Sequence, residues 1–188
     1  MISDEVLMLQ FQCGSVEAFE ELFARYREPL FGFFRRRLNS GERAEDLAQE
    51  TFLAVIRGTS RYEPRALVRT YLYGIALNLL AAERRRQSRN SVEPGTEPAI
   101  DTAADEVLWV RQALERLDTP EREIIILREY EQLSYAEIAE LLQLPLNTVR
   151  SRLFRSRMVL KGYLESESKD GQSAQATQMA NGGEEHGA

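Results

Sequence analysis

Apolar residues recur at three- and four-residue intervals along most of the chain, which is the period of an amphipathic α-helix. No stretch shows the two-residue alternation of a half-buried strand. The sequence therefore predicts an all-α protein, with helical segments within residues 1–38 and at about 42–57, 68–87, 104–117, 121–130, 135–142 and from 146 onward.

Turn-forming and polar residues divide this pattern in three places. A loop is predicted at 58–67, a linker within 88–102, where Pro94, Gly95 and Pro98 occur, and a disordered tail after Glu165, where apolar periodicity ends. We therefore expect two small helical domains joined by a flexible linker. The predicted boundaries are 1–92 for the first domain, 93–104 for the linker, 105–165 for the second domain and 166–188 for the tail.

Within the second domain, two helices are separated by a tight turn. Ser134 and Glu137 have the spacing of a capping box, which predicts a helix starting at Tyr135. Pro145 ends that helix and permits a new one from about Leu146. Two helices joined in this way form a helix-turn-helix, whose second helix enters the major groove of DNA.

The second helix of this motif separates a predicted buried stripe from a basic face. The stripe consists of Leu146, Val149, Leu153 and Leu160. The segment between Leu141 and Leu164 contains five cations and no acid: Arg150, Arg152, Arg155, Arg157 and Lys161. Solvated helix faces usually mix both signs, so this one favours a polyanionic ligand over the alternative, a surface hairpin whose charge only aids solubility.

Charge is distributed unevenly along the chain, whose formal net charge is −6. Residues 57–92 contain eight arginines against Glu63 and Glu83, whereas residues 93–106 contain five acids and no base. The overall acidity therefore does not exclude nucleic-acid binding, because the basic and acidic zones are separate.

Several classes of function find no support in the residues. Cys13 is the single cysteine and the single histidine, His186, lies near the C-terminus, so we expect no metal site and no cofactor. A phosphate-binding glycine loop and a nucleophile motif are absent, which argues against an enzyme. No apolar run approaches the roughly 20 residues of a membrane span, and the acidic N-terminus is unlike a signal peptide, so we expect a cytoplasmic protein.

The helix at about 42–57 has two contrasting faces. Leu47, Thr51, Phe52, Val55 and Ile56 are expected to face inward. The other face presents a polar, acidic cluster formed by Asp46, Gln49 and Glu50. From the residues alone, this cluster is either an ordinary solvated surface or a docking surface for a protein.

Aromatic residues and arginines are interleaved between the loop at 58–67 and the end of the following helix. Tyr62, Tyr71 and Tyr73 offer stacking faces, Asn78 can read a base edge, and arginines can hold phosphates. This combination suits single-stranded DNA better than duplex.

These motifs together resemble bacterial RNA polymerase sigma factors of the extracytoplasmic-function (group IV) subfamily of the sigma-70 family. The segments FEELFARYREPLFGFF and AEDLAQETFLAVIRG are similar to the first two helices of the sigma-2 domain. The segment from Asp118 to Arg157 is similar to the sigma-4 domain nearly throughout.

The resemblance implies a role for each region. Asp46, Gln49 and Glu50 match positions that dock on the β′ clamp helices of core polymerase, and the sigma-4-like domain would meet the β flap. Tyr62 lies in the loop that captures a base flipped from the minus-10 element, Asn78 lines that pocket, and three arginines hold nearby phosphates. The minus-10 set is thus Tyr62, Tyr71, Asn78, Arg84, Arg85 and Arg86.

In the sigma-4-like domain, four residues match positions that meet the minus-35 bases: Arg150, Ser151, Phe154 and Arg155. Thr148, Arg152 and Arg157 are better placed for phosphates. Two departures from the family pattern stand out. Tyr71-Leu72-Tyr73-Gly74 replaces the common Trp-Leu-Tyr-Arg, which shifts duplex melting toward tyrosine packing and removes one arginine contact, and the tail beyond Glu165 has no counterpart.

The resulting hypothesis is a promoter-specificity subunit with core RNA polymerase and promoter DNA as partners. An anti-sigma factor is an expectation from the family alone, since no residue indicates one. Two rival functions remain open at this point: a stand-alone helix-turn-helix repressor or activator, and a protein-interaction module whose DNA contacts are incidental.

Overall fold

The computed structural model describes residues 2–38, 40–64, 67–90 and 112–181. These residues form α-helices and one short 3-10 helix, and none of them lies in a strand, which confirms the all-α class. The chain divides into two compact units, Met1–Thr102 and Ala103–Ala188. The predicted linker at 93–104 lies outside the described residues, as does His186.

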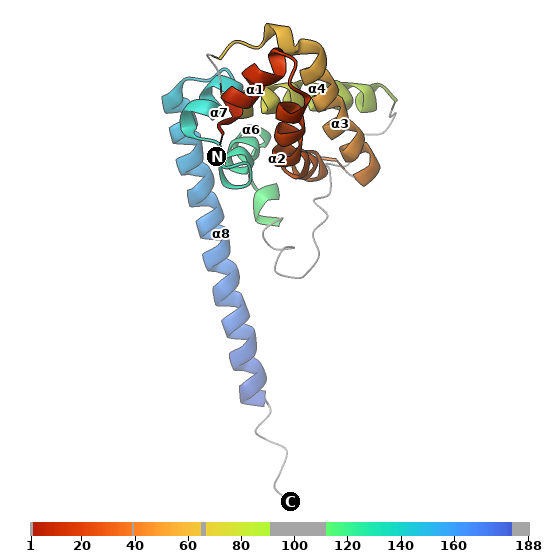
Figure 1. Cartoon of the computed structure of the whole chain (residues 1–188). Helices are drawn as coiled ribbons and strands as arrows, with labels where there is room; N and C mark the ends of the chain where they lie inside the picture. The colour runs from red at the N-terminus through yellow and green to blue at the C-terminus, as the bar shows by residue number, and fades with distance from the viewer. Residues whose placement is uncertain (1, 39, 65–66, 91–111, 182–188) are drawn as a thin grey trace, which may run out of the picture. The chain divides into compact units, whose positions relative to one another are not determined.

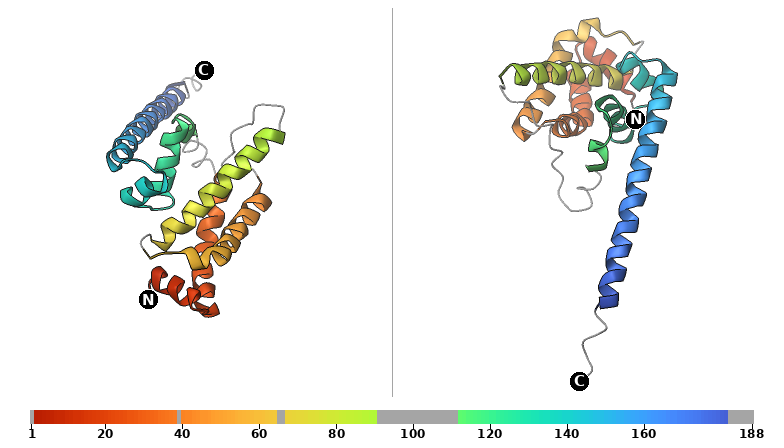
Figure 2. Two further views of the ribbon diagram at one scale, coloured as in Figure 1. Left: turned by 90° about the horizontal axis from the view of Figure 1, so that it is seen from above. Right: turned by 180° about the vertical axis from the view of Figure 1, so that it is seen from behind.

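Unit 1 is built from α1 (Asp4–Gln12), α2 (Val16–Arg35), α3 (Gly41–Gly58), η1 (Thr59–Arg61) and α4 (Val68–Asn90). Helix α3 packs against both α2 and α4, and α1 lies against α2, η1 and α4 (Figure 1). The two further views in Figure 2 show α4, drawn in yellow-green, as the long helix that follows the loop after α3. Helices α1 and α3 therefore both contact η1 and α4.

Serine caps explain where the first three helices begin. The hydroxyl oxygens of Ser3, Ser15 and Ser40 each accept a hydrogen bond from a backbone N–H three residues later, at 3.3, 3.2 and 3.1 Å. Such a cap satisfies one of the backbone donors left over at a helix start and contributes about 1 kcal/mol.

The core of unit 1 is rich in aromatic side chains. Phe33 and Phe34 are fully buried, and the ring of Phe33 lies 5.1 Å from Phe34 and 5.5 Å from Tyr73 on α4. Phe23 of α2 meets Phe52 of α3 at 4.7 Å between ring centroids. Each buried phenylalanine stabilises the unit by about 1.5–3 kcal/mol, so these contacts hold α2, α3 and α4 together.

Two expectations for unit 1 differ from the structure, and one helix boundary was not predicted. Pro29 interrupts the apolar pattern and predicts a kink or a division of the helix, but α2 continues through it; Pro29 is exposed, and Leu30 and Phe33 after it remain buried. Ile56, expected to face inward, is 46% exposed. Helix α1, which ends before the strong periodicity of α2 begins, was not separated from it by the sequence pattern.

Unit 2 contains helical residues at 112–115, then α6 (Thr119–Glu129), α7 (Tyr135–Leu141) and α8 (Leu146–Asn181). Both halves of the predicted capping box are present. Ser134 Oγ accepts from the Glu137 N–H at 3.2 Å, and the Ser134 N–H donates to Glu137 Oε2 at 2.7 Å. Gln143 then adopts a left-handed backbone, with φ of 54°, and Pro145 precedes α8. The helix-turn-helix is confirmed.

Helix α8 packs its first turns against α6 and α7 and then projects beyond them (Figure 1). Val149 and Leu153 are buried as expected. Leu146, the first residue of α8 after the turn, is 37% exposed. The helix also continues to Asn181, where a disordered tail was expected from 166. The segment 166–181 contains no proline, and extending an existing helix costs much less than starting one.

Among the described residues, no helix is long and apolar enough to span a membrane.

Candidate nucleic-acid interface

The outward face of α8 carries the residues that the sequence assigned to duplex DNA. Arg150, Ser151, Phe154 and Arg155 recur at one-, four- and five-residue offsets and are all exposed, opposite the buried Val149 and Leu153. Phe154 is 67% exposed, which is unusual for the largest apolar side chain of a helix that has a buried face. Its position in the middle of a basic face favours contact with an external ligand.

Ion pairs with α6 hold some of these cations. The Arg155 guanidinium lies 3.5 Å from the Glu121 carboxylate, and Arg157 donates to Glu129 at 2.7 Å and to the Tyr135 hydroxyl at 3.2 Å. The hydrogen bond that Arg157 donates to Glu129 raises the pKa of Arg157, which favours its charged form. Exposed pairs of this kind contribute only about 0–1 kcal/mol, and phosphates can replace the carboxylates at little cost.

A buried polar contact fixes α8 on α6. Ser156 is fully buried, and its hydroxyl donates to the carbonyl of Arg152 at 2.9 Å and lies 3.4 Å from that of Glu121. Because Ser156 is on the inner side, the outward face of α8 has a fixed orientation relative to α6. The connection between α6 and α7 is fixed by Arg128 of α6, which lies 5.3 Å over the ring of Tyr135 and donates to the Leu133 carbonyl at 2.9 Å.

In unit 1, the residues assigned to single-stranded DNA follow one face of α4. Tyr71, Asn78 and Arg85 are spaced by seven residues, so they lie nearly in line and about 10 Å apart along the helix axis. Asn78 and the three consecutive arginines from Arg84 to Arg86 are exposed. The structure therefore brings an aromatic ring, an amide and the Arg85 cation onto one helix face, with Arg84 and Arg86 about 100° to either side of it.

Tyr62 occupies a different position from the one its predicted role suggests. Its side chain is only 5% exposed, and its ring packs on Tyr71 with 5.3 Å between centroids. Burial raises the pKa of Tyr62. The Tyr71 hydroxyl approaches Gly58 so closely that a Cβ built there would lie 3.0 Å from it. The buried ring of Tyr62 thus supports the ring of Tyr71, and the missing side chain of Gly58 leaves space for the Tyr71 hydroxyl.

The acidic cluster of α3 is organised by Arg43. The Arg43 guanidinium reaches Asp46 at 3.5 Å, Glu50 at 3.1 Å and Glu83 of α4 at 2.9 Å. Glu83 is 5% exposed, and its hydrogen bond from Arg43 lowers its pKa. Asp46 and Gln49 remain exposed. Arg43 therefore ties the outward acidic face of α3 to the helix that carries Asn78.

Sequence reasoning missed several residues on these surfaces. On α3, Leu53 is 47% exposed four residues after Gln49, and it adds an apolar centre to the acidic cluster together with Ile56. On α8, Met158 is 52% exposed one turn after Phe154, and Asn147 is exposed one turn before Ser151. Helical offsets from the assigned residues could have found all four.

The part of the chain that the structure describes contains no group of three His, Cys, Asp or Glu side chains that could hold a metal ion.

Comparison with known proteins places both units in one family. Residues 22–90 match "Sigma-70 region 2" and residues 108–160 match "Sigma-70, region 4". The RNA polymerase sigma-H factor of Pseudomonas aeruginosa is 30% identical over 86% of this chain and 94% of its own length. The ECF RNA polymerase sigma-E factor of Haemophilus influenzae is 32% identical over 87% of this chain and 96% of its own. The chain belongs to the extracytoplasmic-function group of the sigma-70 family.

Solved structures share the fold of this chain. The structure of CnrH in complex with the cytosolic domain of CnrY has a TM-score of 0.68 and 28% identity, covering 87% of this chain and 97% of that one. The sigma factor RpoE of Bartonella quintana, solved in complex with the anti-sigma factor NepR, has the same fold, with a TM-score of 0.64 and 24% identity. The match covers 80% of this chain and 98% of the RpoE chain. This sigma factor is therefore a transcription initiation factor that directs core RNA polymerase to promoters. Helix α1 and the part of α8 after residue 160 lie outside the matched regions.

Proposed function

We propose that this sigma factor reads the minus-35 element as duplex with α8 and opens the minus-10 element with the exposed face of α4. The observation that carries the proposal is the outward face of α8, where Phe154 is 67% and Arg155 62% exposed amid further cations. An exposed aromatic ring among cations is suited to binding a polyanion such as DNA.

At minus-35, four residues face the base edges: Arg150, Ser151, Phe154 and Arg155. Arginine suits the paired acceptors of guanine, and the phenylalanine ring suits the methyl group of thymine. Thr148, Arg152 and Arg157 lie on the flanks of this face and bind phosphates. Arg157 exchanges Glu129 for a phosphate when DNA arrives, which costs little because the pair is exposed.

At minus-10, Tyr71 supplies the stacking surface and Asn78 reads a base edge about two turns further along α4. Because Tyr62 is buried, it contributes as the support beneath Tyr71 and as part of the loop backbone. Arg84, Arg85 and Arg86 hold the strand by its phosphates. Stacking contributes about 1–3 kcal/mol per base, which is enough to offset the unpairing of a flipped base.

Docking on core polymerase uses the acidic cluster of α3. Asp46, Gln49 and Glu50 face the β′ clamp helices, and Leu53 adds the apolar contact that a stable protein interface needs at its centre. The helix-turn-helix unit meets the β flap. This division gives each unit one contact with polymerase and one with the promoter.

The protein acts by binding alone and performs no catalysis, because its work is to position polymerase and DNA. It acts in the cytoplasm, where core polymerase and the chromosome are found. An anti-sigma factor is a further partner, since the sigma factor RpoE of Bartonella quintana, which shares the fold, is solved in complex with the anti-sigma factor NepR.

Paired substitutions test the division of labour between the two DNA-binding surfaces. Two probes are taken from a promoter mapped among the transcripts that this chain starts with core polymerase: a minus-35 duplex and a fork that is single-stranded over minus-10. Arg155→Ala should weaken holoenzyme binding to the duplex about 5- to 150-fold and at one base position above all. Asn78→Ala should weaken binding to the fork alone.

Arg27→Ala is the matched control, because Arg27 on α2 is an exposed arginine with no assigned DNA contact in the described residues. Equal losses on both probes for Arg155→Ala and Asn78→Ala would contradict the proposed division.

A further inference from the structure

Helix α1 holds the loop that precedes α4, although α1 lies outside the matched sigma-70 region 2. The side-chain amide of Gln12 donates from Nε2 to the carbonyl of Thr59 at 2.5 Å and to the carbonyl of Tyr62 at 2.9 Å. These partners lie 47 and 50 residues further along the chain. One side chain therefore connects the last residue of α1 to the loop that carries Tyr62.

The arrangement of these bonds is that of a clamp. Thr59 opens the η1 turn and Tyr62 closes it, and the Tyr62 N–H itself donates to the Thr59 carbonyl at 3.1 Å. An amide NH2 group has two hydrogens, and Gln12 directs one to each end of this turn. Both partners are acceptors, so only the nitrogen of the amide can face them.

A second side chain of α1 reaches the other end of the same segment. Glu5 Oε1 accepts a hydrogen bond from the Val68 N–H, the first of α4, at 3.4 Å. A carboxylate suits this position, because the first backbone donors of a helix lack internal partners and carry partial positive charge. Gln12 and Glu5 thus bracket the loop between η1 and α4.

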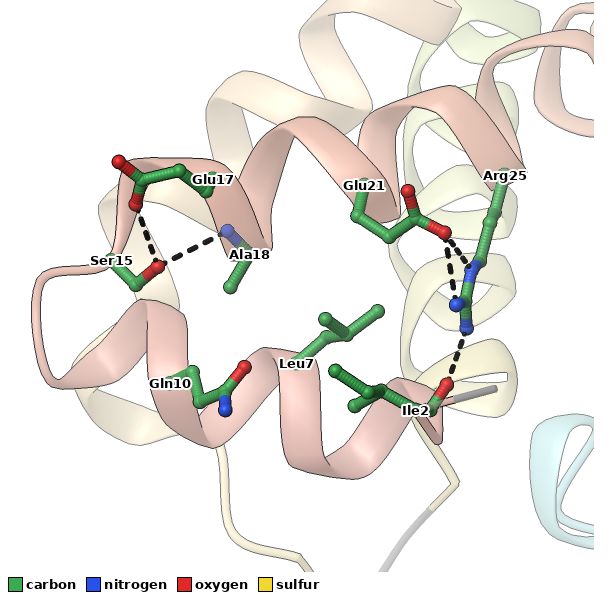
Figure 3. Close-up of a pocket in the computed structure, with 8 residues that line it drawn as sticks. All are labelled: Ile2, Leu7, Gln10, Ser15, Glu17, Ala18, Glu21 and Arg25. Carbon is green, nitrogen blue, oxygen red and sulfur yellow. Dashed lines mark hydrogen bonds and ion pairs between the residues drawn. The ribbon is translucent and has the colours of Figure 1, made fainter.

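Helix α1 is itself firmly anchored on α2, as Figure 3 shows. The Arg25 guanidinium donates to the Ile2 carbonyl at 2.9 Å and to Asp4 at 2.6 Å, while it also pairs with Glu21 on its own helix. The Tyr26 hydroxyl bonds to the same Asp4. Leu7 is buried between the two helices. Because these contacts fix α1 on α2, the side chains of α1 hold the loop in a fixed position.

We propose that Gln12 is a positioning residue for minus-10 recognition, and that α1 is the element through which it acts. The inference rests on the proposed role of the α4 face. The backbone at Tyr62 sets where its ring lies, that ring supports Tyr71 at 5.3 Å, and Asn78 follows on the same helix face. Holding both ends of η1 therefore sets the shape of the surface that receives the flipped base.

The test compares Gln12→Glu and Gln12→Met with Gln10→Glu in the full-length chain. Glutamate keeps the size of Gln12 but presents oxygens to two carbonyls, and methionine keeps the length without any donor. Gln10 is an exposed glutamine on the same helix, so Gln10→Glu reproduces the charge change away from the loop.

Both Gln12 variants should weaken holoenzyme binding to the minus-10 fork by at least about fivefold, the equivalent of one ordinary hydrogen bond. Binding to the minus-35 duplex and affinity for core polymerase should stay at the wild-type level. Amide hydrogen exchange should accelerate in the peptide that covers Thr59–Tyr62, while exchange in α2 and α3 stays unchanged. Gln10→Glu should match the wild type in every assay.

Wild-type fork binding in Gln12→Glu would overturn the proposal, and so would exchange that accelerates throughout α2, α3 and α4, since that result indicates a general loss of stability. Asn78→Ala distinguishes this failure from failure of the proposed function. If Asn78→Ala weakens fork binding and Gln12→Glu does not, the positioning role alone is wrong. If Asn78→Ala has no effect on the fork, the minus-10 assignment of α4 is wrong.

Discussion

Arg43→Ala should destabilise unit 1 far more than the loss of a surface cation would. The Arg43 guanidinium lies 2.9 Å from a Glu83 carboxylate that is 5% exposed, and it bridges α4 to Glu50 on α3. Removing the Arg43 side chain leaves the Glu83 carboxylate charged, without its partner and with little access to water. Such an uncompensated buried charge strongly lowers the free energy of unfolding.

The magnitude follows from the burial of the two partners. Truncating one member of a fully buried pair costs about 3–5 kcal/mol. Arg43 is 24% exposed, and Gln87 still donates to Glu83 at 3.3 Å, so we expect about 2–3 kcal/mol here. Arg27→Ala is the control: Arg27 and Glu28 are 62% and 71% exposed, and its loss should cost less than about 0.5 kcal/mol.

Native-state hydrogen exchange in the full chain measures this difference for each unit separately. The slowest amides of α3 and α4 should exchange about 30- to 150-fold faster in Arg43→Ala, the equivalent of 2–3 kcal/mol, while α6 and α7 keep their rates. Acceleration of less than about threefold, or no greater than in Arg27→Ala, would refute the reasoning.

The same pair predicts a pH dependence. Arg43 lowers the pKa of Glu83 in the folded protein, so the unfolded chain takes up the proton more readily. This stabilisation is fully present above the unfolded pKa of about 4.3 and is lost as the pH falls through the lower folded pKa. The difference in unfolding free energy between wild type and Arg43→Ala should therefore narrow below about pH 4. A difference that stays constant down to pH 3 would contradict this account.

Three further substitutions test the helix-turn-helix and the two DNA-binding surfaces. Ser134→Ala should cost about 1 kcal/mol, seen as faster exchange in α7, because it breaks the capping box with Glu137; unchanged exchange would contradict this. Phe154→Ala should change the unfolding free energy by less than about 0.5 kcal/mol, since the ring is 67% exposed. The same substitution should abolish selective binding of the minus-35 duplex in a mobility-shift assay. A large loss of stability would contradict the assignment of Phe154 to the DNA-binding face. Gly58→Ala should displace the Tyr71 hydroxyl and slow minus-10 opening, followed by the fluorescence of a base analogue, and wild-type opening rates would argue against a role for Tyr71.

The helix-turn-helix was predictable because its signals are local. The capping box at Ser134 and Glu137, the break at Pro145 and the buried Val149 and Leu153 all depend on residues a few positions apart. The basic face of α8 was predictable for the same reason, since charge and helical period are both visible in the sequence.

Contacts between distant segments could not be predicted in this way. Gln12 bonds to backbone carbonyls, which every residue possesses, so no residue type 47 or 50 positions away marks its partner. The burial of Tyr62 and the exposure of Ile56 depend on how α1 packs on η1 and α4 and on how α4 packs on α3, which periodicity within one helix does not determine. Pro29 shows that packing on one face of α2 can outweigh a local helix breaker.

The central claim is that this chain directs core RNA polymerase to a promoter and opens it there. The most direct measurement is in vitro transcription with purified core polymerase on a mapped promoter, with permanganate footprinting of unpaired thymines over minus-10. We expect start-site-specific transcripts and reactive thymines only when the chain is present, and both should be reduced in Asn78→Ala. Promoter-specific transcripts from core polymerase without the chain, or none when it is added, would contradict the account.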